Sequence, residues 1–424
     1  DSIYYMAANV EENIERTRRY GNKPLYAYEW LRYHDSNKKL AGQEVAPWLA
    51  EAMAVVPYFC GARGVALWGN LVISTTGKDG RVIATDKETG KIVWDKNLHD
   101  QPEVELSSAP LALEDDIIVG ASGGDQGVRD WIVSLDPKTG NVKWKTFAIP
   151  APGEPGSETW KDKNNAWQTG GGAFYVTGSY DPQTNLTYWG SGNPAPGYDA
   201  SYRPGDNLFT SSAIAFNVAN GKMEWYFQYT PNDSRDYDET GTHILIDTKV
   251  NGEDRKIVTH PGRNGFNYTF DRTNGQFLKA GQYVGKVNWT KGIDPKTGKP
   301  LDYDPSKDFQ LYAEPANVNT DKLARRVCPD QAGGNNFWPS SYSPKTKMLY
   351  VPSVEGCSDI TPDHSAHVKG KFAGGGYFNP ERLTSQIVVV DPTTGEKKAH
   401  KDMPYPNSAG VLSTAGGVIV TALL

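Results

Sequence analysis

The sequence predicts an all-β fold, best matched by a β-propeller made of four-stranded blades. Three observations indicate this class: a high content of turn residues, a hairpin phrase that recurs along the chain, and little helical periodicity. The 424 residues include 44 Gly and 28 Pro, a composition that favours many turns between short strands. Recurrence of one hairpin along a long chain is typical of a repeat architecture.

The recurring phrase is a short apolar run followed by a turn that starts with Asp or Asn and ends in Gly. Such turns reverse the chain and join two antiparallel strands. They occupy residues 86–90, 136–140, 217–221, 271–275 and 391–395. The first three turns are followed shortly by Trp94, Trp144 and Trp225. We expect these indoles to fill the space between adjacent blades, which is a structural role.

Other segments complete the predicted organisation. Apolar runs at 117–119, 186–189 and 348–351 predict further strands. Residues 408–424 are uncharged and long enough for a weak membrane span, but their Ser, Thr and Gly-Gly content favours two buried strands with a turn. Residues 10–33 have some helical character and are interpreted as a loop or cap. Because no linker divides the chain, residues 1–424 are predicted to form one domain.

Composition narrows the classes of partner. Hydrophobic residues make up 38% of the chain, which is enough for a large core. The formal net charge is −6 and the sequence has no basic run. A nucleic-acid partner is therefore not expected, and neither is a membrane span.

Two aspartates flank a tyrosine in the stretch RDYDETG, residues 235–241. In an extended strand, residues i and i+2 point to the same face, so Asp236 and Asp238 would aim at one place. Like charges repel there unless a cation lies between them or one of them takes up a proton. A solvated turn is the simpler alternative.

Several polar clusters have the composition of loops around the central channel of a propeller. Each one alone is equally compatible with an ordinary turn. Together they supply carboxylates, an amide and an arginine, which suit a hard cation beside an anionic ligand. The clusters lie at residues 122–129, 190–196, 236–238, 259–265 and 333–338.

Five motifs make a family resemblance visible. They are GNPAP (192–196), YRPGDN (202–207), the segment 230–238, THPGRNG (259–265) and DRTNG (271–275). In order and spacing they resemble the pyrroloquinoline quinone (PQQ)-dependent alcohol dehydrogenases, the family of the bacterial methanol dehydrogenases. The resemblance runs from about residue 60 to the end of the chain. It implies an eight-bladed propeller with PQQ in the central channel over a metal ion, and we expect this chain to lack parts of the first and last blades.

The resemblance implies a metal site of four residues. The ligand asparagine falls on Asn193 and the catalytic aspartate on Asp236. The ligand glutamate of the family falls on Asp125, whose side chain is shorter. Asp238 matches the extra aspartate of the lanthanide-dependent branch, and a trivalent ion offsets one more carboxylate than calcium does. The expected ion is thus a lanthanide, with Ca²⁺ as the alternative.

The resemblance also implies the cofactor-binding residues. PQQ is a flat tricarboxylate, which arginines and small hydroxyls bind well. The family stacks an indole on the cofactor, and that position is Tyr175 here. Cys328 and Cys357 match a family disulfide, whereas the adjacent-cysteine disulfide is missing, since only Cys60 stands near its place. The other implied PQQ contacts are Arg63, Ser107, Ser122, Arg263 and Asn336.

The implied reaction is oxidation of an alcohol by hydride transfer to PQQ, with Asp236 as general base and Arg263 stabilising negative charge. Gly197 stands where methanol-oxidising members carry Trp, so we expect an alcohol larger than methanol. A soluble cytochrome c is the expected electron acceptor and the periplasm the expected compartment, with a homodimer left open. The alternatives are a calcium-dependent PQQ sugar or polyol dehydrogenase and a non-catalytic, protein-binding propeller.

Overall fold

The computed structural model describes residues 64–313, 318, 323–364, 371, 374–404 and 408–421. All of them belong to the second of two compact units into which the chain divides, Glu44–Leu424. Arg63, Cys60 and the cap predicted at residues 10–33 lie outside the described residues. The prediction that residues 1–424 form one domain stays a prediction.

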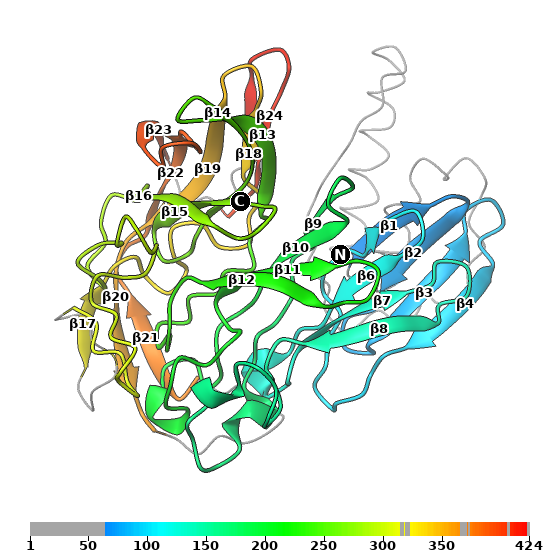
Figure 1. Cartoon of the computed structure of the whole chain (residues 1–424), viewed down its shortest axis with the longest axis horizontal. Coiled ribbons are helices and arrows are strands. Elements are labelled where there is room, and N and C mark those ends of the chain that lie inside the picture. The colour runs from blue at the N-terminus through cyan, green and yellow to red at the C-terminus, as the bar shows by residue number, and fades with distance from the viewer. Residues whose placement is uncertain are drawn as a thin grey trace, which may run out of the picture. The chain divides into compact units, whose positions relative to one another are not determined.

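Five of the seven sheets in the described residues are antiparallel and have four strands (Figure 1). The first two sheets are β1 (Gly64–Trp68), β2 (Leu71–Thr75), β3 (Arg81–Asp86), β4 (Ile92–Asn97), and β5 (Leu111–Ala112), β6 (Ile117–Gly120), β7 (Trp131–Leu135), β8 (Val142–Phe147). The next two are β9 (Ser179–Asp181), β10 (Leu186–Gly190), β11 (Ser212–Asn217), β12 (Met223–Gln228), and β13 (Ile244–Val250), β14 (Glu253–Pro261), β15 (Phe266–Asp271), β16 (Phe277–Gln282).

A further four-stranded sheet has the order β18 (Ser341–Ser343), β19 (Met348–Glu355), β22 (Thr384–Val390), β23 (Lys397–Met403). Between β19 and β22 the chain forms part of a smaller sheet, β17 (Ala324–Val327), β20 (Ser358–Pro362), β21 (Gly376–Pro380). The described residues include short 3₁₀ turns but no α-helix. Sequential four-stranded sheets confirm the predicted all-β, blade-like fold.

The predicted hairpin turns are confirmed in all five places. Each joins the last two strands of a four-stranded sheet, as in the β3–β4 and β7–β8 pairs. Each of the three indoles donates its N–H to a backbone carbonyl in or beside the turn of the following sheet. These bonds join Trp94 to Pro137, Trp144 to Val218 and Trp225 to Arg272, at 2.9, 2.7 and 3.1 Å.

The glycine that ends each turn is what admits the neighbouring indole. A Cβ on Gly140, Gly221 or Gly275 would lie 2.6, 2.4 or 2.7 Å from the ring of the preceding sheet's tryptophan. These glycines also have φ near +70° to +77°, which other residues rarely adopt. One sequence phrase therefore encodes both the hairpin and the contact between successive blades.

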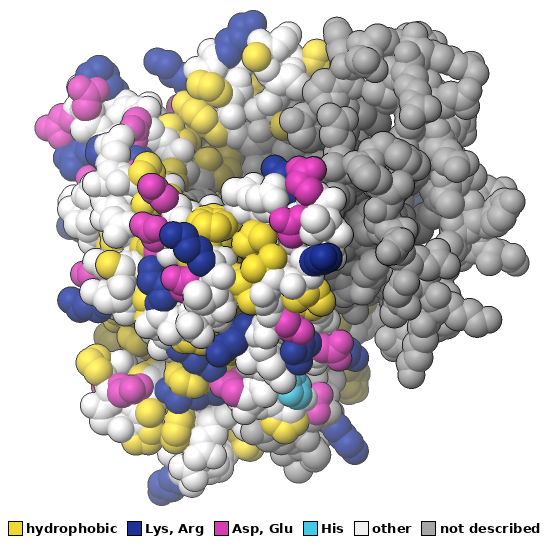
Figure 2. Space-filling view, turned by 90° about the vertical axis from the view of Figure 1, so that its right-hand side faces the viewer, with side chains coloured by type: hydrophobic (Ala, Val, Ile, Leu, Met, Phe, Trp, Pro, Cys, Tyr) yellow, Lys and Arg dark blue, Asp and Glu magenta, His cyan; other side chains and the backbone are white. Residues whose placement is uncertain are grey.

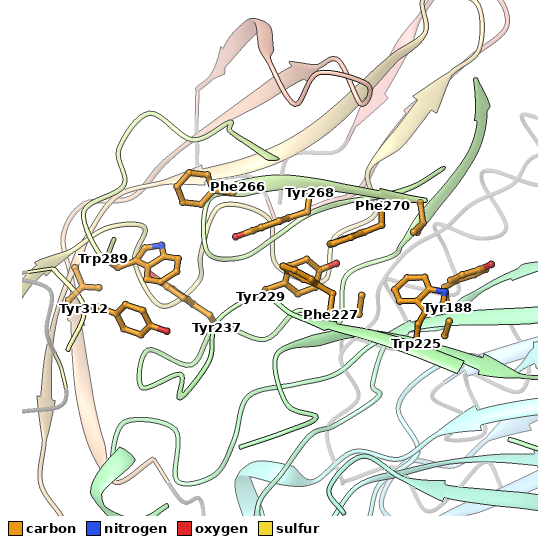
Figure 3. Close-up of a cluster of buried hydrophobic side chains, with 14 of the residues drawn as sticks. Tyr188, Trp225, Phe227, Tyr229, Tyr237, Phe266, Tyr268, Phe270, Trp289 and Tyr312 are labelled. Atoms are coloured by element: carbon orange, nitrogen blue, oxygen red, sulfur yellow. The ribbon is translucent and has the colours of Figure 1, made fainter. Parts of the chain in front are cut away.

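An aromatic cluster fills the space between the β9–β12 and β13–β16 sheets. Figure 3 shows Phe227 and Tyr229 facing Tyr268 and Phe270. The ring centroids of Phe227 and Phe270 are 4.7 Å apart, and those of Tyr229 and Tyr268 are 4.8 Å apart. Burial of such rings stabilises the arrangement of the two sheets and of the loops that leave them.

The prediction for the C-terminal segment is half right. β24 (Val411–Ser413) and β25 (Ile419–Thr421) pair antiparallel around a turn, as expected. They are not two buried strands, however, because Leu412, Val418 and Val420 are 50–60% exposed. The two-stranded sheet leaves one face of this hairpin uncovered. Within the described residues, no helix is long and apolar enough to cross a membrane.

The described part of the face in Figure 2 carries Lys and Arg interspersed with Asp and Glu, with apolar side chains between them. Polar side chains also reach the interior, and Arg203, Arg235, Asp233 and Glu239 are completely buried. Burying a charge is costly unless the charge is paired, so buried charged residues often belong to a functional site. The candidate site is therefore expected in the interior polar loops and not on this mixed surface.

Candidate cofactor and metal site

Loops from three successive sheets bring most of the predicted site residues together. Asp125 lies on a 3₁₀ turn, Gly124–Gln126, between β6 and β7, and Asn193 lies in the loop after β10. Asp236 and Asp238 lie in the loop between β12 and β13, and Arg263 lies in the turn between β14 and β15. Because these loops leave the same ends of neighbouring sheets, residues as far apart in the sequence as Asp125 and Asn193 come into contact.

Asn193 is the centre of one half of the cluster. Its side-chain Nδ2 donates to Oδ1 of Asp125 at 3.3 Å, and its backbone N–H donates to Oδ1 of Asp238 at 2.8 Å. The hydroxyl of Tyr175 donates to the other oxygen of Asp238 at 2.9 Å. Three predicted metal ligands and the predicted stacking residue thus form one hydrogen-bonded group.

Arg263 forms the other half of the cluster. Its guanidinium lies 3.1 Å from Oδ2 of Asp238 and 3.7 Å from Oδ1 of Asp236. It also donates to the backbone carbonyl of Asp236. The two aspartates therefore do share a positive partner, as the paired carboxylates of the sequence suggested.

The prediction that an extended strand brings the two aspartates together was wrong. Residues 230–241 are not in a strand, and Asp236 has a left-handed φ of 62°. Asp and Asn adopt this conformation more readily than other non-glycine residues. Gln331 and Tyr198 both donate to Oδ2 of Asp236, the latter at 3.5 Å, and fix the carboxylate that the turn presents.

Burial controls the electrostatics of these groups. It raises the pKa of Asp236 well above its usual range, with Arg263 opposing the rise and Asp238 adding to it. Burial, with the charge of Asp238, raises the pKa of Asp125 to about 6. Burial alone would lower the pKa of Arg263, but Asp238, Tyr175 and Asp236 outweigh it and hold that pKa above its usual value. The cluster is therefore a buried, net acidic site.

Within the described part of the chain, the other residues that were predicted to bind the cofactor form no hydrogen bond with the aspartates of the cluster. Ser107 and Ser122 bond to each other at 3.0 Å, and Ser122 also bonds to the carbonyl of Glu105. These described bonds do not reach Arg263 or the aspartates. Asn336 lies in a loop that packs on Arg263, since Gly334 N–H donates to the Arg263 carbonyl at 3.0 Å. Its Oδ1 is buried without a hydrogen-bond partner.

A buried His–Glu group next to the site was missed from the sequence. Glu239 directly follows Asp238 in the chain. Its Oε2 accepts a hydrogen bond from the backbone N–H of Arg263 at 3.0 Å and lies 2.9 Å from Nε2 of His260. The His260 ring stacks on His243 with 4.2 Å between centroids. Both His260 and Arg263 belong to the THPGRNG motif, but nothing in the sequence pairs either with Glu239.

The burial of His260 predicts that the protein loses stability as the pH falls. Burial lowers the pKa of His260 from 6.5 to about 3. Below about pH 6.5 the unfolded chain binds a proton that the folded chain does not, so the free energy of unfolding should fall toward pH 3. The slope per histidine is up to about 1.4 kcal/mol per pH unit. Urea unfolding of His260→Asn between pH 4 and 7 should show a shallower pH dependence than the parent protein.

The exposed His400 supplies the matched control for that measurement. His400→Asn, a substitution at an exposed position, is expected to keep the parent slope. Equal slopes for His260→Asn and the parent protein would contradict the assignment.

The residues present fit a hard cation and an anionic cofactor. Among the described residues, His, Cys, Asp and Glu alone form no group of three that could hold an ion; the candidate set instead mixes carboxylates with the amide of Asn193. Oxygen donors of this kind suit calcium or a lanthanide. A Cβ at Gly192 would lie only 2.7 Å from Oδ1 of Asp238. A residue with a side chain at position 192 would therefore crowd this carboxylate, and glycine leaves room for it. The buried Nε of Arg263, without a partner, is a free donor for an anion.

The disulfide predicted between Cys328 and Cys357 is present. It joins the end of β17 to the segment just before β20. The chain between these cysteines includes the 333–338 loop that packs on Arg263. The disulfide therefore closes a loop on which part of the site is built.

The fold is a β-propeller of the quinoprotein type, as comparison with known proteins shows. Residues 96–280 match the family "PQQ: Glucose/ethanol/alcohol dehydrogenase, beta-propeller domain". The quinoprotein alcohol dehydrogenase PedH of Pseudomonas putida is 34% identical over 85% of this chain and 62% of its own length. Subunit 1 of the methanol dehydrogenase [cytochrome c] of Methylorubrum extorquens is 32% identical over 84% of this chain and 60% of its own.

A solved structure, a europium-containing methanol dehydrogenase, superimposes with a TM-score of 0.78 at 29% identity. It covers 84% of this chain, and this chain covers 64% of it. The chain is a relative of the PQQ-dependent alcohol dehydrogenases, and the resemblance drawn from its motifs is confirmed. It spans about three-fifths of the length of these relatives.

Proposed function

We propose that the protein oxidises an alcohol to an aldehyde or ketone with PQQ and a bound metal ion. The observation that carries this proposal is the position of Arg263, whose guanidinium faces both Asp236 and Asp238 in a buried cluster that also holds Asn193 and Asp125. A protein-binding scaffold has no need for such a cluster, because burying several carboxylates lowers stability. A chemical role accounts for it.

The residues divide into two groups by the ligand that they would hold. Asp125, Asn193, Asp236 and Asp238 supply oxygens for the ion. When bound, PQQ supplies a quinone that accepts a hydride from the alcohol carbon, and the ion supplies Lewis acidity. The residues that would hold PQQ are Arg63, Ser107, Ser122, Tyr175, Arg263 and Asn336.

Asp236 is the proposed general base. Gln331 and Tyr198 hold its Oδ2, so the carboxylate has a fixed orientation toward the interior of the site. Its raised pKa makes it a stronger base than an exposed aspartate for removal of the alcohol proton. Arg263, held permanently charged, would offset the negative charge that develops during the reaction.

The proposed ion is a lanthanide, because Asp238 adds a carboxylate to the site and a trivalent ion offsets it. Asp238→Ala tests this directly. The parent protein with PQQ should turn over with lanthanum and not with calcium, and the variant should show the reverse preference. An unchanged preference would count against the assignment and favour a calcium-dependent dehydrogenase of the same fold.

Gly197 is the proposed determinant of substrate size. A Cβ at this position would lie 3.4 Å from Nδ2 of Asn193 and 3.8 Å from Cβ of Asp236, so a side chain there would enter the space beside the base. Gly197→Trp should reduce kcat/KM for a long-chain alcohol about 10- to 100-fold and affect methanol less. The measurement is kcat/KM for methanol and 1-hexanol in the same preparation.

The exposed Gly416 serves as the control, since only Thr414 Oγ1 lies near its Cβ position, at 3.8 Å. Gly416→Trp is expected to leave both kcat/KM values unchanged. Loss of methanol and 1-hexanol oxidation in equal proportion in Gly197→Trp would refute the proposed role.

The proposed electron acceptor is a soluble cytochrome c, and the proposed compartment is the periplasm. The Cys328–Cys357 disulfide supports an oxidising compartment. The name of the Methylorubrum relative includes cytochrome c, which supports a cytochrome c as the acceptor. A homodimer stays a prediction.

A further inference from the structure

Asp130 is a buried carboxylate that the proposed mechanism does not use. It lies just before β7, and its exposed fraction is 0%. Its backbone is fixed, since its N–H donates to Gly171 at 3.1 Å and its carbonyl accepts from Ala148 at 2.9 Å. Neither carboxylate oxygen has a hydrogen-bond partner. A buried carboxylate without partners is costly and calls for a proton or a cation nearby.

Burial raises the pKa of Asp130 well above its usual range, and three negative groups add to the rise. They are Asp125, Asp238 and Asp100, and the first two are proposed ligands of the ion. Two buried like charges are tolerated when a cation of sufficient charge lies among them. The surroundings of Asp130 therefore call for the same cation as those of Asp125 and Asp238.

The backbone around Asp130 leaves room for its carboxylate beside the ion ligands. Oδ2 of Asp130 lies 2.8 Å from the place that a Cβ on Gly124 would take, and Gly124 directly precedes Asp125. Gly171, which accepts the Asp130 N–H, lies so close to Asn193 that a Cβ there would be 2.7 Å from the Asn193 carbonyl oxygen. The Asp130 carboxylate is thus enclosed between the loop of Asp125 and the backbone next to Asn193.

We propose that Asp130 is a further carboxylate of the cation site, and that it favours a trivalent over a divalent ion. This inference rests on the proposed function, which places an ion among Asp125, Asn193, Asp236 and Asp238. The Asp130 carboxylate lies against the turn that carries Asp125, and it adds negative charge on that side of the site. A simple structural role would instead keep Asp130 permanently protonated, with no effect on ion binding.

The test is ion binding, measured apart from activity. Europium(III) is titrated into the metal-free protein with PQQ and followed by its luminescence, and calcium is measured by competition. For Asp130→Asn, which keeps the side-chain shape, the Kd for europium(III) should rise at least about tenfold and the Kd for calcium by less. The metal-free variant should unfold at a temperature no lower than the metal-free parent, because a costly buried acid is gone.

Two further variants make the outcome unambiguous. Asp130→Ser removes the carboxylate by a different substitution and should weaken europium(III) binding to a similar extent. Asp115→Asn alters an exposed aspartate on the β5–β6 hairpin and should leave both Kd values unchanged. Europium(III) binding by folded Asp130→Asn within twofold of the parent would overturn the inference and leave the proposed function standing. Failure of the parent itself to bind either ion would overturn the proposed function.

Discussion

Asp236→Asn is expected to lower kcat about 10²- to 10⁴-fold, the range that a general base contributes. Asparagine keeps one side-chain oxygen and the hydrogen-bonding shape but cannot take the alcohol proton. It also tolerates the left-handed φ of 62° at this position, so the loop should keep its conformation. The measurement is steady-state turnover of the lanthanide- and PQQ-loaded protein with an artificial electron acceptor.

Loss of ion binding has to be separated from loss of the base, because Asp236 is also a proposed ligand. Europium(III) luminescence of Asp236→Asn gives the ion occupancy under the assay conditions, and rates are compared at saturating ion. The control is Asp115→Asn, which alters an exposed carboxylate and should turn over like the parent protein. A saturated Asp236→Asn protein that retains the parent kcat would contradict the assignment of the base.

The fold was predictable because its signals are local. The geometry of a turn that starts with Asp and ends in Gly is determined by its own residues. The indole that follows it packs on the next such turn along the chain. Asp86, for example, binds the backbone N–H groups of Glu88 and Thr89 within its own turn. The C-terminal hairpin was predicted from the same signals, but its exposure was not. The burial of a strand depends on the segments that pack over it, and these segments cannot be identified from the sequence of the hairpin.

The site was only partly predictable, for a related reason. The motifs identified Asn193, Asp236 and Arg263, and the loops do bring them together. The conformation of Asp236 was misjudged, because its left-handed φ leaves no signal in the sequence and its carboxylate contacts Gln331, a residue far along the chain. Glu239 was missed because a single glutamate has no pattern of its own. Its role is visible only where His260 and the Arg263 N–H meet it.

Trp144→Ala is expected to lower the free energy of unfolding by about 3–5 kcal/mol, the usual cost of removing a buried large aromatic side chain. The indole is 8% exposed, lies against Gly221 of the next sheet's turn and donates its N–H to the Val218 carbonyl at 2.7 Å. The variant loses apolar burial, leaves a cavity between two sheets and leaves a carbonyl without its donor. Denaturant unfolding followed by circular dichroism measures the change.

Trp144→Phe divides that loss into its parts, since it keeps much of the apolar contact but removes the N–H donor and part of the ring system. It should cost less than Trp144→Ala, by an amount larger than the roughly 1 kcal/mol of one hydrogen bond. Leu67→Ala, at a side chain that is 65% exposed, is the control and should change stability by no more than about 0.5 kcal/mol. If Trp144→Ala were as mild as the control, the contact between successive sheets would not depend on the recurring tryptophan. The regular phrase in the sequence would then encode the hairpins alone, and some other set of contacts would have to hold the loops of the site in place.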